Sequence, residues 1–109
     1  MKNTTILIDD KEYDVVIGEN KLDNENVVKT SKWNDTYFHF NNISGPHIVL
    51  RNGGNIIPKR YLVEVAKLLF VYKKNAPKNA GVLYTNVKNV VLTEELGSVI
   101  LHKTKLLKF

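Results

Sequence analysis

The sequence contains no cysteine, and this absence excludes several kinds of site. Without thiols the chain has no disulfide, no thiolate nucleophile and no cysteine-ligated zinc. Long hydrophobic runs are also missing, since the first apolar stretch, Ile6 to Ile8, is followed directly by Asp9. That stretch is too short for a signal peptide, and no later segment approaches the length of a membrane span. We therefore expect a soluble, cytoplasmic protein without a membrane partner.

The basic residues are distributed unevenly along the 109-residue chain, which has a formal net charge of +5. Residues 1–31 contain four lysines against seven acidic residues (4 − 7 = −3), and residues 32–109 contain twelve basic against four acidic residues (12 − 4 = +8). With 43% hydrophobic residues, the length suits one domain with a modest core. The asymmetry indicates either a polyanion-binding face or an ordinary solvated lysine surface.

Short strands separated by turn residues dominate the predicted secondary structure. Residues 1–15 are expected to form an N-terminal hairpin, with strands at Thr4–Ile8 and Glu12–Ile17 and a turn at "DDK". Further strands are expected at Thr36–Phe40, at His47–Arg51, and in "VLYT" and "VKNVVLT", followed by a closing hairpin of "GSVILH" and "KLLKF". Helices are expected at about 20–30 and 58–74, the second with Pro58 as its first residue. These elements predict a small α+β domain, 1–109, of mostly antiparallel strands with two helices.

The second predicted helix has two distinct faces. Its apolar stripe consists of Leu62, Val65, Ala66 and Leu69. Arg60, Lys67 and Lys74 recur every seven residues and are expected on a common exposed face. This face is either a basic ridge that binds a polyanion or a helix surface that simply points lysines to water.

The segment "NDTYFHFNNISGPHIVLRN" gathers histidines, aromatics, Asp35 and an arginine. His39 and His47 would approach each other if their strands pair, but only Asp35 and the distant His102 are available as further metal ligands. Asp35 and His39 are poor acid–base partners, because residues i and i+4 of an extended strand are separated by roughly 13 Å. We expect no catalytic centre, no metal and no cofactor. The histidines are better explained as structural or partner-contacting residues.

Recognition of a nucleic acid suits the same segment better. Tyr37 and His39 are of the types that stack on bases or form hydrogen bonds, and Arg51 is of the type that neutralises phosphate. Trp33 just before them is either a stacking platform or a core edge. Core packing is the common role of strand aromatics, so both interpretations stay open.

The order of several motifs from about Val16 to Phe109 resembles the RNA-binding domain of NFACT proteins, which are ribosome-associated quality-control factors. The motifs are "VIGENKLDNENVV", "NDTYFH", "GPHIVLR", "LVEVAKLL", "LYTNVKNV" and "LGSVIL". Residues that match the family's motifs are Gly18, Asn20, Asn24, Asp35, Tyr37, Phe38, His39, Gly45, His47, Val49, Arg51, Tyr84, Thr85, Val87 and Lys88. Three positions depart from the family pattern: Tyr37 stands where Trp is usual, Pro46 replaces a small residue, and Ala66 stands where a pair of alanines is common.

The resemblance implies a non-catalytic RNA-binding module, here expected as a stand-alone domain, with tRNA or rRNA and the large ribosomal subunit as partners. The residues predicted to contact nucleic acid are Asn20, Asn24, Asp35, Tyr37, His39, His47, Arg51, Arg60, Lys67, Lys74 and Lys88. Two alternatives stay open: a protein-interaction adaptor, and a module that binds double-stranded DNA, which a basic surface does not distinguish from RNA.

Overall fold

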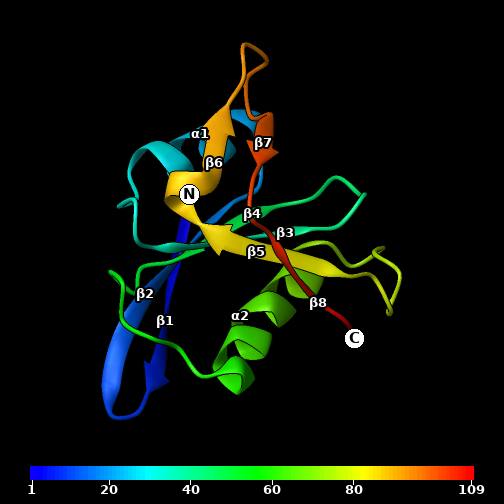
Figure 1. The fold of residues 1–109 in the computed structure, drawn as a ribbon. Helices are drawn as coiled ribbons and strands as arrows, with labels where there is room; N and C mark the ends of the chain where they lie inside the picture. The colour runs from blue at the N-terminus through cyan, green and yellow to red at the C-terminus, as the bar shows by residue number, and fades with distance from the viewer.

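A six-stranded antiparallel sheet runs through the computed structural model, which describes residues 1–109 (Figure 1). Its strands lie in the order β1-β2-β4-β3-β5-β8, and β6 and β7 form a separate two-stranded sheet. The elements are β1 (Lys2–Ile8), β2 (Lys11–Gly18), α1 (Lys21–Lys29), β3 (Thr36–Phe40), β4 (His47–Leu50), α2 (Lys59–Tyr72), β5 (Val82–Asn86), the short 3₁₀ helix η1 (Val87–Asn89), β6 (Val90–Leu92), β7 (Val99–Leu101) and β8 (Lys105–Leu107). Two helices and eight mostly antiparallel strands confirm the predicted α+β class.

The β1–β2 hairpin closes through a two-residue turn. Ile8 pairs with Lys11, and Asp9 and Asp10 between them have φ values of 49° and 64°. Such turns need positive φ at both central residues, and aspartate tolerates that conformation better than most residues. The predicted hairpin is therefore present, and its strands are slightly longer than expected.

The central strands of the sheet are covered on both faces. On one face of the sheet, Val65 and Leu69 of α2 pack against Phe38, Phe40 and their neighbours. On the other face, side chains of α1, η1 and β6 pack against alternate residues of β2, β3 and β4. Figure 1 shows α2 below the sheet and α1 with β6 and β7 above it. Because both faces are buried, these strands are nearly continuous apolar runs, as in "VVI" and "HIVL".

Both predicted helices are present, with boundaries that differ by one or two residues. Asn20 is the N-cap of α1, where its side chain accepts a hydrogen bond from the Asp23 backbone amide. Pro58 directly precedes α2 instead of forming its first residue, and the helix ends at Tyr72 because Lys73 leaves the helical conformation. Neither helix is long and apolar enough to cross a membrane.

The C-terminal strands do not pair as predicted. "GSVILH" and "KLLKF" were expected to form a hairpin, but β7 pairs with β6 and β8 pairs with β5. Lys103, between the two strands, has a φ of 53° and takes part in the turn that sends the chain from one sheet to the other. The predicted strand "VKNVVLT" is likewise divided, since η1 occupies its first three residues.

Candidate nucleic-acid interface

Tyr37, His39 and His47 form a cluster on the α1 side of the sheet. The Tyr37 hydroxyl lies 2.8 Å from His47 Nδ1, and the two imidazole rings meet edge to face with their centroids 4.7 Å apart. His39 Nδ1 lies 2.8 Å from the carbonyl oxygen of Phe40. Because a carbonyl oxygen only accepts, His39 Nδ1 is the donor in this hydrogen bond. The strand pairing thus brings together the two histidines that the sequence analysis singled out.

Burial keeps this cluster uncharged. It lowers the pKa of His47 to about 3, and the neighbouring His39 acts in the same direction. Burial also lowers the pKa of His39, against the opposing effect of its backbone hydrogen bond to Phe40. The pKa of the Tyr37 phenol is raised by burial. At neutral pH both histidines are therefore neutral and supply hydrogen-bonding groups, not positive charge, to any ligand.

Two of the predicted contact residues are structural in this fold. Tyr37 is 0% exposed, so its ring has no face open to a base and its hydroxyl supports His47. Asp35 is also buried. Its carboxylate accepts hydrogen bonds from the backbone amides of Lys32 and Gly53, which fixes the two loops that flank β3 and β4.

The two histidines line a hollow of about 540 Å³ on the α1 side of the sheet. Asn24, Ser44 and Ser98 also line it, and none of its lining residues is an aspartate, glutamate, lysine or arginine. No group of three or more potential metal ligands is found in the structure. The hollow offers neutral hydrogen-bonding groups only.

The glycine of the Gly18, Asn20 and Asn24 motif has a clear steric explanation. A Cβ atom at Gly18 would lie 2.7 Å from Asn24 Oδ1 and 2.8 Å from the Asn24 backbone nitrogen, so only glycine allows α1 to pack so closely against the end of β2. Asn20 caps the helix. Asn24 Oδ1 is buried without a hydrogen-bond partner in the protein. Asn24 lines the hollow of the histidines, and both asparagines line a neighbouring one of about 350 Å³.

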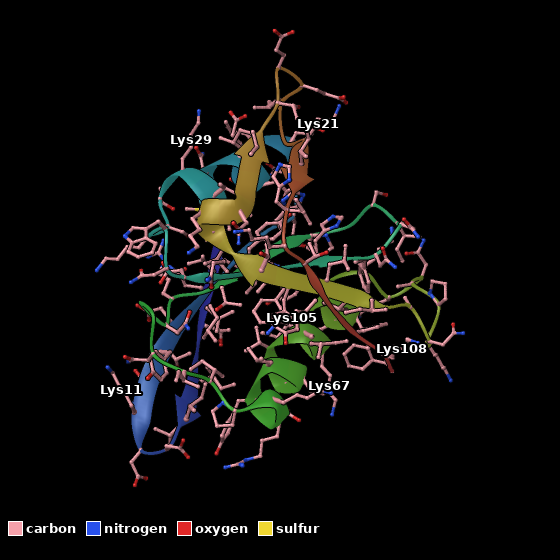
Figure 2. All side chains as sticks on the ribbon, viewed as in Figure 1. Lys11, Lys21, Lys29, Lys67, Lys105 and Lys108 are labelled. Carbon is pink, nitrogen blue, oxygen red and sulfur yellow. The ribbon has the colours of Figure 1, made fainter.

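The predicted basic residues do not form one ridge. Arg60 and Lys67 are exposed on α2, but each lies beside a carboxylate, 3.8 Å from Asp9 and 3.3 Å from Glu64 respectively. Lys74 lies beyond the end of α2. Arg51 is half-buried at the opposite side of the sheet, where its guanidinium donates to the Thr30 hydroxyl. Figure 2 shows Lys67 beside α2, far from Lys21 and Lys29 near α1.

Lys88 lies apart from the basic residues of α2 and from Arg51, in a groove of about 670 Å³ that we call the lysine groove. Lys88, Lys103 and Lys105 line it together with Trp33, and Lys88 Nζ lies 5.5 Å from the centroid of the indole. Lys103 and Lys105 are not among the contact residues predicted from the sequence. Strand alternation does not predict their place, because Lys103 has a φ of 53° and β8 begins only at Lys105.

Comparison with known proteins agrees with this fold. The model of the NFACT protein RNA binding domain matches residues 4–103. Coiled-coil domain-containing protein 25 from Mus musculus is 29% identical over 110 residues, an alignment that covers 94% of this chain and 53% of that protein. Its homolog from Dictyostelium discoideum is 32% identical over 108 residues, covering 92% of this chain and 52% of that protein. The chain thus spans about half the length of the curated relatives it matches.

A solved structure shows the same fold at low sequence identity. The C-terminal part of the fibronectin/fibrinogen-binding protein from Streptococcus suis superposes with a TM-score of 0.82 at 20% identity, covering 99% of this chain and 45% of that one. The family match includes the N-terminal hairpin from Thr4 onward, which the motifs beginning at Val16 did not reach. With a family model matched over nearly its whole length, this chain belongs to the NFACT RNA-binding domain family.

Proposed function

We propose that this domain binds structured RNA of the translation machinery, tRNA or rRNA, and catalyses no reaction. The observation that carries the proposal is the match of an RNA-binding-domain family over residues 4–103. The charge distribution supports it, because residues 32–109 contain twelve basic against four acidic residues. We also propose a role in ribosome-associated quality control, with the large ribosomal subunit as a partner, on the basis of the same family resemblance.

The histidine cluster supports a binding role over a catalytic one. A general acid or base works best with a pKa near the working pH, whereas burial lowers the pKa of His47 to about 3. No carboxylate lines the surrounding hollow to orient or charge either imidazole. In our proposal the cluster maintains the shape of the α1 side of the sheet, and phosphate is neutralised by exposed lysines elsewhere.

A fluorescence-anisotropy titration tests the proposal. Labelled tRNA, an unstructured single-stranded RNA and duplex DNA would each be titrated with the protein at low and at physiological salt. We expect tRNA to bind most tightly, with a preference that persists at the higher salt. Equal binding to all three that disappears with salt would mean general polyanion attraction, which contradicts the proposal. No binding to any of them would favour a protein partner.

A further inference from the structure

The lysine groove lies on the α2 side of the sheet, beside the start of that helix. Leu62 from the first turns of α2 lines it, as do residues of the loop that leads from β4 into α2. Opposite this loop are the end of β5, η1 and the beginning of β8. Within the sheet Thr36 of β3 pairs with Asn86 of β5, and both line the groove. The groove is therefore framed by helix and strand residues on one part of its wall and by loop residues on the other.

Its charge is positive and uncompensated. Lys88, Lys103 and Lys105 are all exposed, and none of them forms an ion pair in the structure, whereas Arg60 and Lys67 on α2 do. No aspartate or glutamate lines the groove. Figure 2 shows Lys105 between β5 and α2. Three unpaired ammonium groups around one depression match a chain of phosphates far better than a neutral or cationic ligand.

An exposed aromatic platform accompanies the lysines. Trp33 is 64% exposed, although a tryptophan is usually largely buried. Its backbone is fixed, because the Trp33 carbonyl accepts a hydrogen bond from the Lys88 amide and the preceding Lys32 amide donates to the buried carboxylate of Asp35. A solvent-exposed indole on a fixed backbone, with an ammonium group over one face of its ring, leaves the other face for stacking on a nucleobase.

Side-chain amides complete the lining. Asn52 donates to a backbone carbonyl, Asn89 donates to the Thr85 hydroxyl, and Asn55 donates to the Tyr13 hydroxyl, so these three amides have structural partners. Asn86 is exposed and has no side-chain hydrogen bond within the protein. Its amide is free to donate to or accept from the edge of an unpaired base.

We propose that the lysine groove holds an unpaired segment of RNA, with one base stacked on Trp33 and the adjoining phosphates beside Lys88, Lys103 and Lys105. This proposal rests on the proposed RNA-binding function and locates it. An unpaired segment fits better than a duplex, because the bases of a helix are stacked on each other and do not reach an indole on a protein surface. The residues of the ridge predicted on α2 have no part in this site.

Trp33 is the only tryptophan of the chain, which provides a direct readout. A short oligouridine RNA would be titrated into the full chain while the tryptophan fluorescence and the anisotropy of labelled RNA are recorded. We expect the fluorescence to be quenched with the same midpoint as the rise in anisotropy. We expect Trp33→Ala to weaken binding by about 5- to 150-fold and Trp33→Phe to weaken it less, since one stacked base contributes about 1–3 kcal/mol.

A lysine pair tests the phosphate contacts. Lys88→Ala combined with Lys105→Ala is expected to reduce the slope of log affinity against log salt by about 1.4, since each phosphate contact on a single strand contributes about 0.7. Lys11→Ala combined with Lys108→Ala removes the same charge from exposed positions outside the groove and is expected to leave the slope nearly unchanged. Urea denaturation of each variant checks that the fold is retained.

The outcomes separate this inference from the proposed function. RNA binding that is equally strong in wild type, in Trp33→Ala and in the groove lysine pair would overturn the groove and leave RNA binding in place. Tighter binding of duplex RNA than of the single strand, with no quenching, would also overturn it. No binding of any RNA by the wild type would refute the proposed function and the groove together.

Discussion

Acid should destabilise this domain at a pH where aspartates and glutamates hardly titrate, because His47 is buried and uncharged. Its side chain is held by the Tyr37 hydroxyl at 2.8 Å, and its pKa is lowered by burial to about 3. In the unfolded chain the pKa of a histidine is about 6.5. The folded state is therefore favoured in full above about pH 6.5, and this contribution is lost progressively as the pH falls toward 3.

The size of the effect follows from the two pKa values. Between about pH 7 and pH 5 the unfolded chain gains a proton at this position that the folded chain does not bind. This lowers the free energy of unfolding by about 2 kcal/mol from His47 alone. The lowered pKa of His39 acts in the same direction. Aspartates and glutamates contribute little over this range, since their usual pKa values are about 4.

Urea denaturation at both pH values measures this directly. We expect His47→Gln to lose the part of the pH dependence that comes from His47, about 2 kcal/mol, because an amide does not titrate, and to keep the part that comes from His39. His102→Gln is the matched control, since this third histidine is exposed, and it should retain the acid sensitivity of the wild type. A wild-type unfolding free energy that is the same at pH 7 and pH 5 would refute the assignment of a buried neutral histidine pair.

Three further predictions concern stability and are measured by urea denaturation. Leu69→Ala should lower the free energy of unfolding by about 2–5 kcal/mol because Leu69 is 0% exposed, whereas Val71→Ala on the same helix, at 57% exposure, should have little effect; equal losses would contradict the packing. Asn20→Ala should cost about 1 kcal/mol through loss of the α1 cap, and Asn20→Ser, which keeps an acceptor for the Asp23 amide, should restore most of it; if both lose equally, the cap is not the cause. Tyr37→Phe should cost about 1–3 kcal/mol by leaving a buried imidazole nitrogen unpaired, and Tyr61→Phe, which removes a hydroxyl without such a partner, should cost less.

Local patterns in the sequence predicted much of the fold. The turn at Asp9 and Asp10, the strand Thr36–Phe40 and, to within one residue, the start of α2 near Pro58 could be predicted from neighbouring residues. The pairing of the last two strands could not be predicted from neighbouring residues. β7 and β8 pair with β6 and β5 because the turn at Lys103 directs the chain to a different sheet, which alternation of apolar residues within a strand does not reveal.

The candidate site was predictable only in part. The approach of His39 and His47 followed from the pairing of β3 with β4, which neighbouring apolar strands suggest. The burial of Tyr37 could not be predicted in this way, because an alternating strand shows which residues share a face but not that a second helix covers that face. The lysine groove joins Trp33 to Lys103, seventy residues apart (103 − 33 = 70), and only the folded sheet brings them together.

The affinity ratio between tRNA and duplex DNA of similar phosphate number decides whether this domain selects RNA. Both would be measured by anisotropy in one buffer at physiological salt. We predict that tRNA binds at least several-fold more tightly than the duplex. Equal affinities, or tighter binding of the DNA, would contradict RNA as the ligand of this domain.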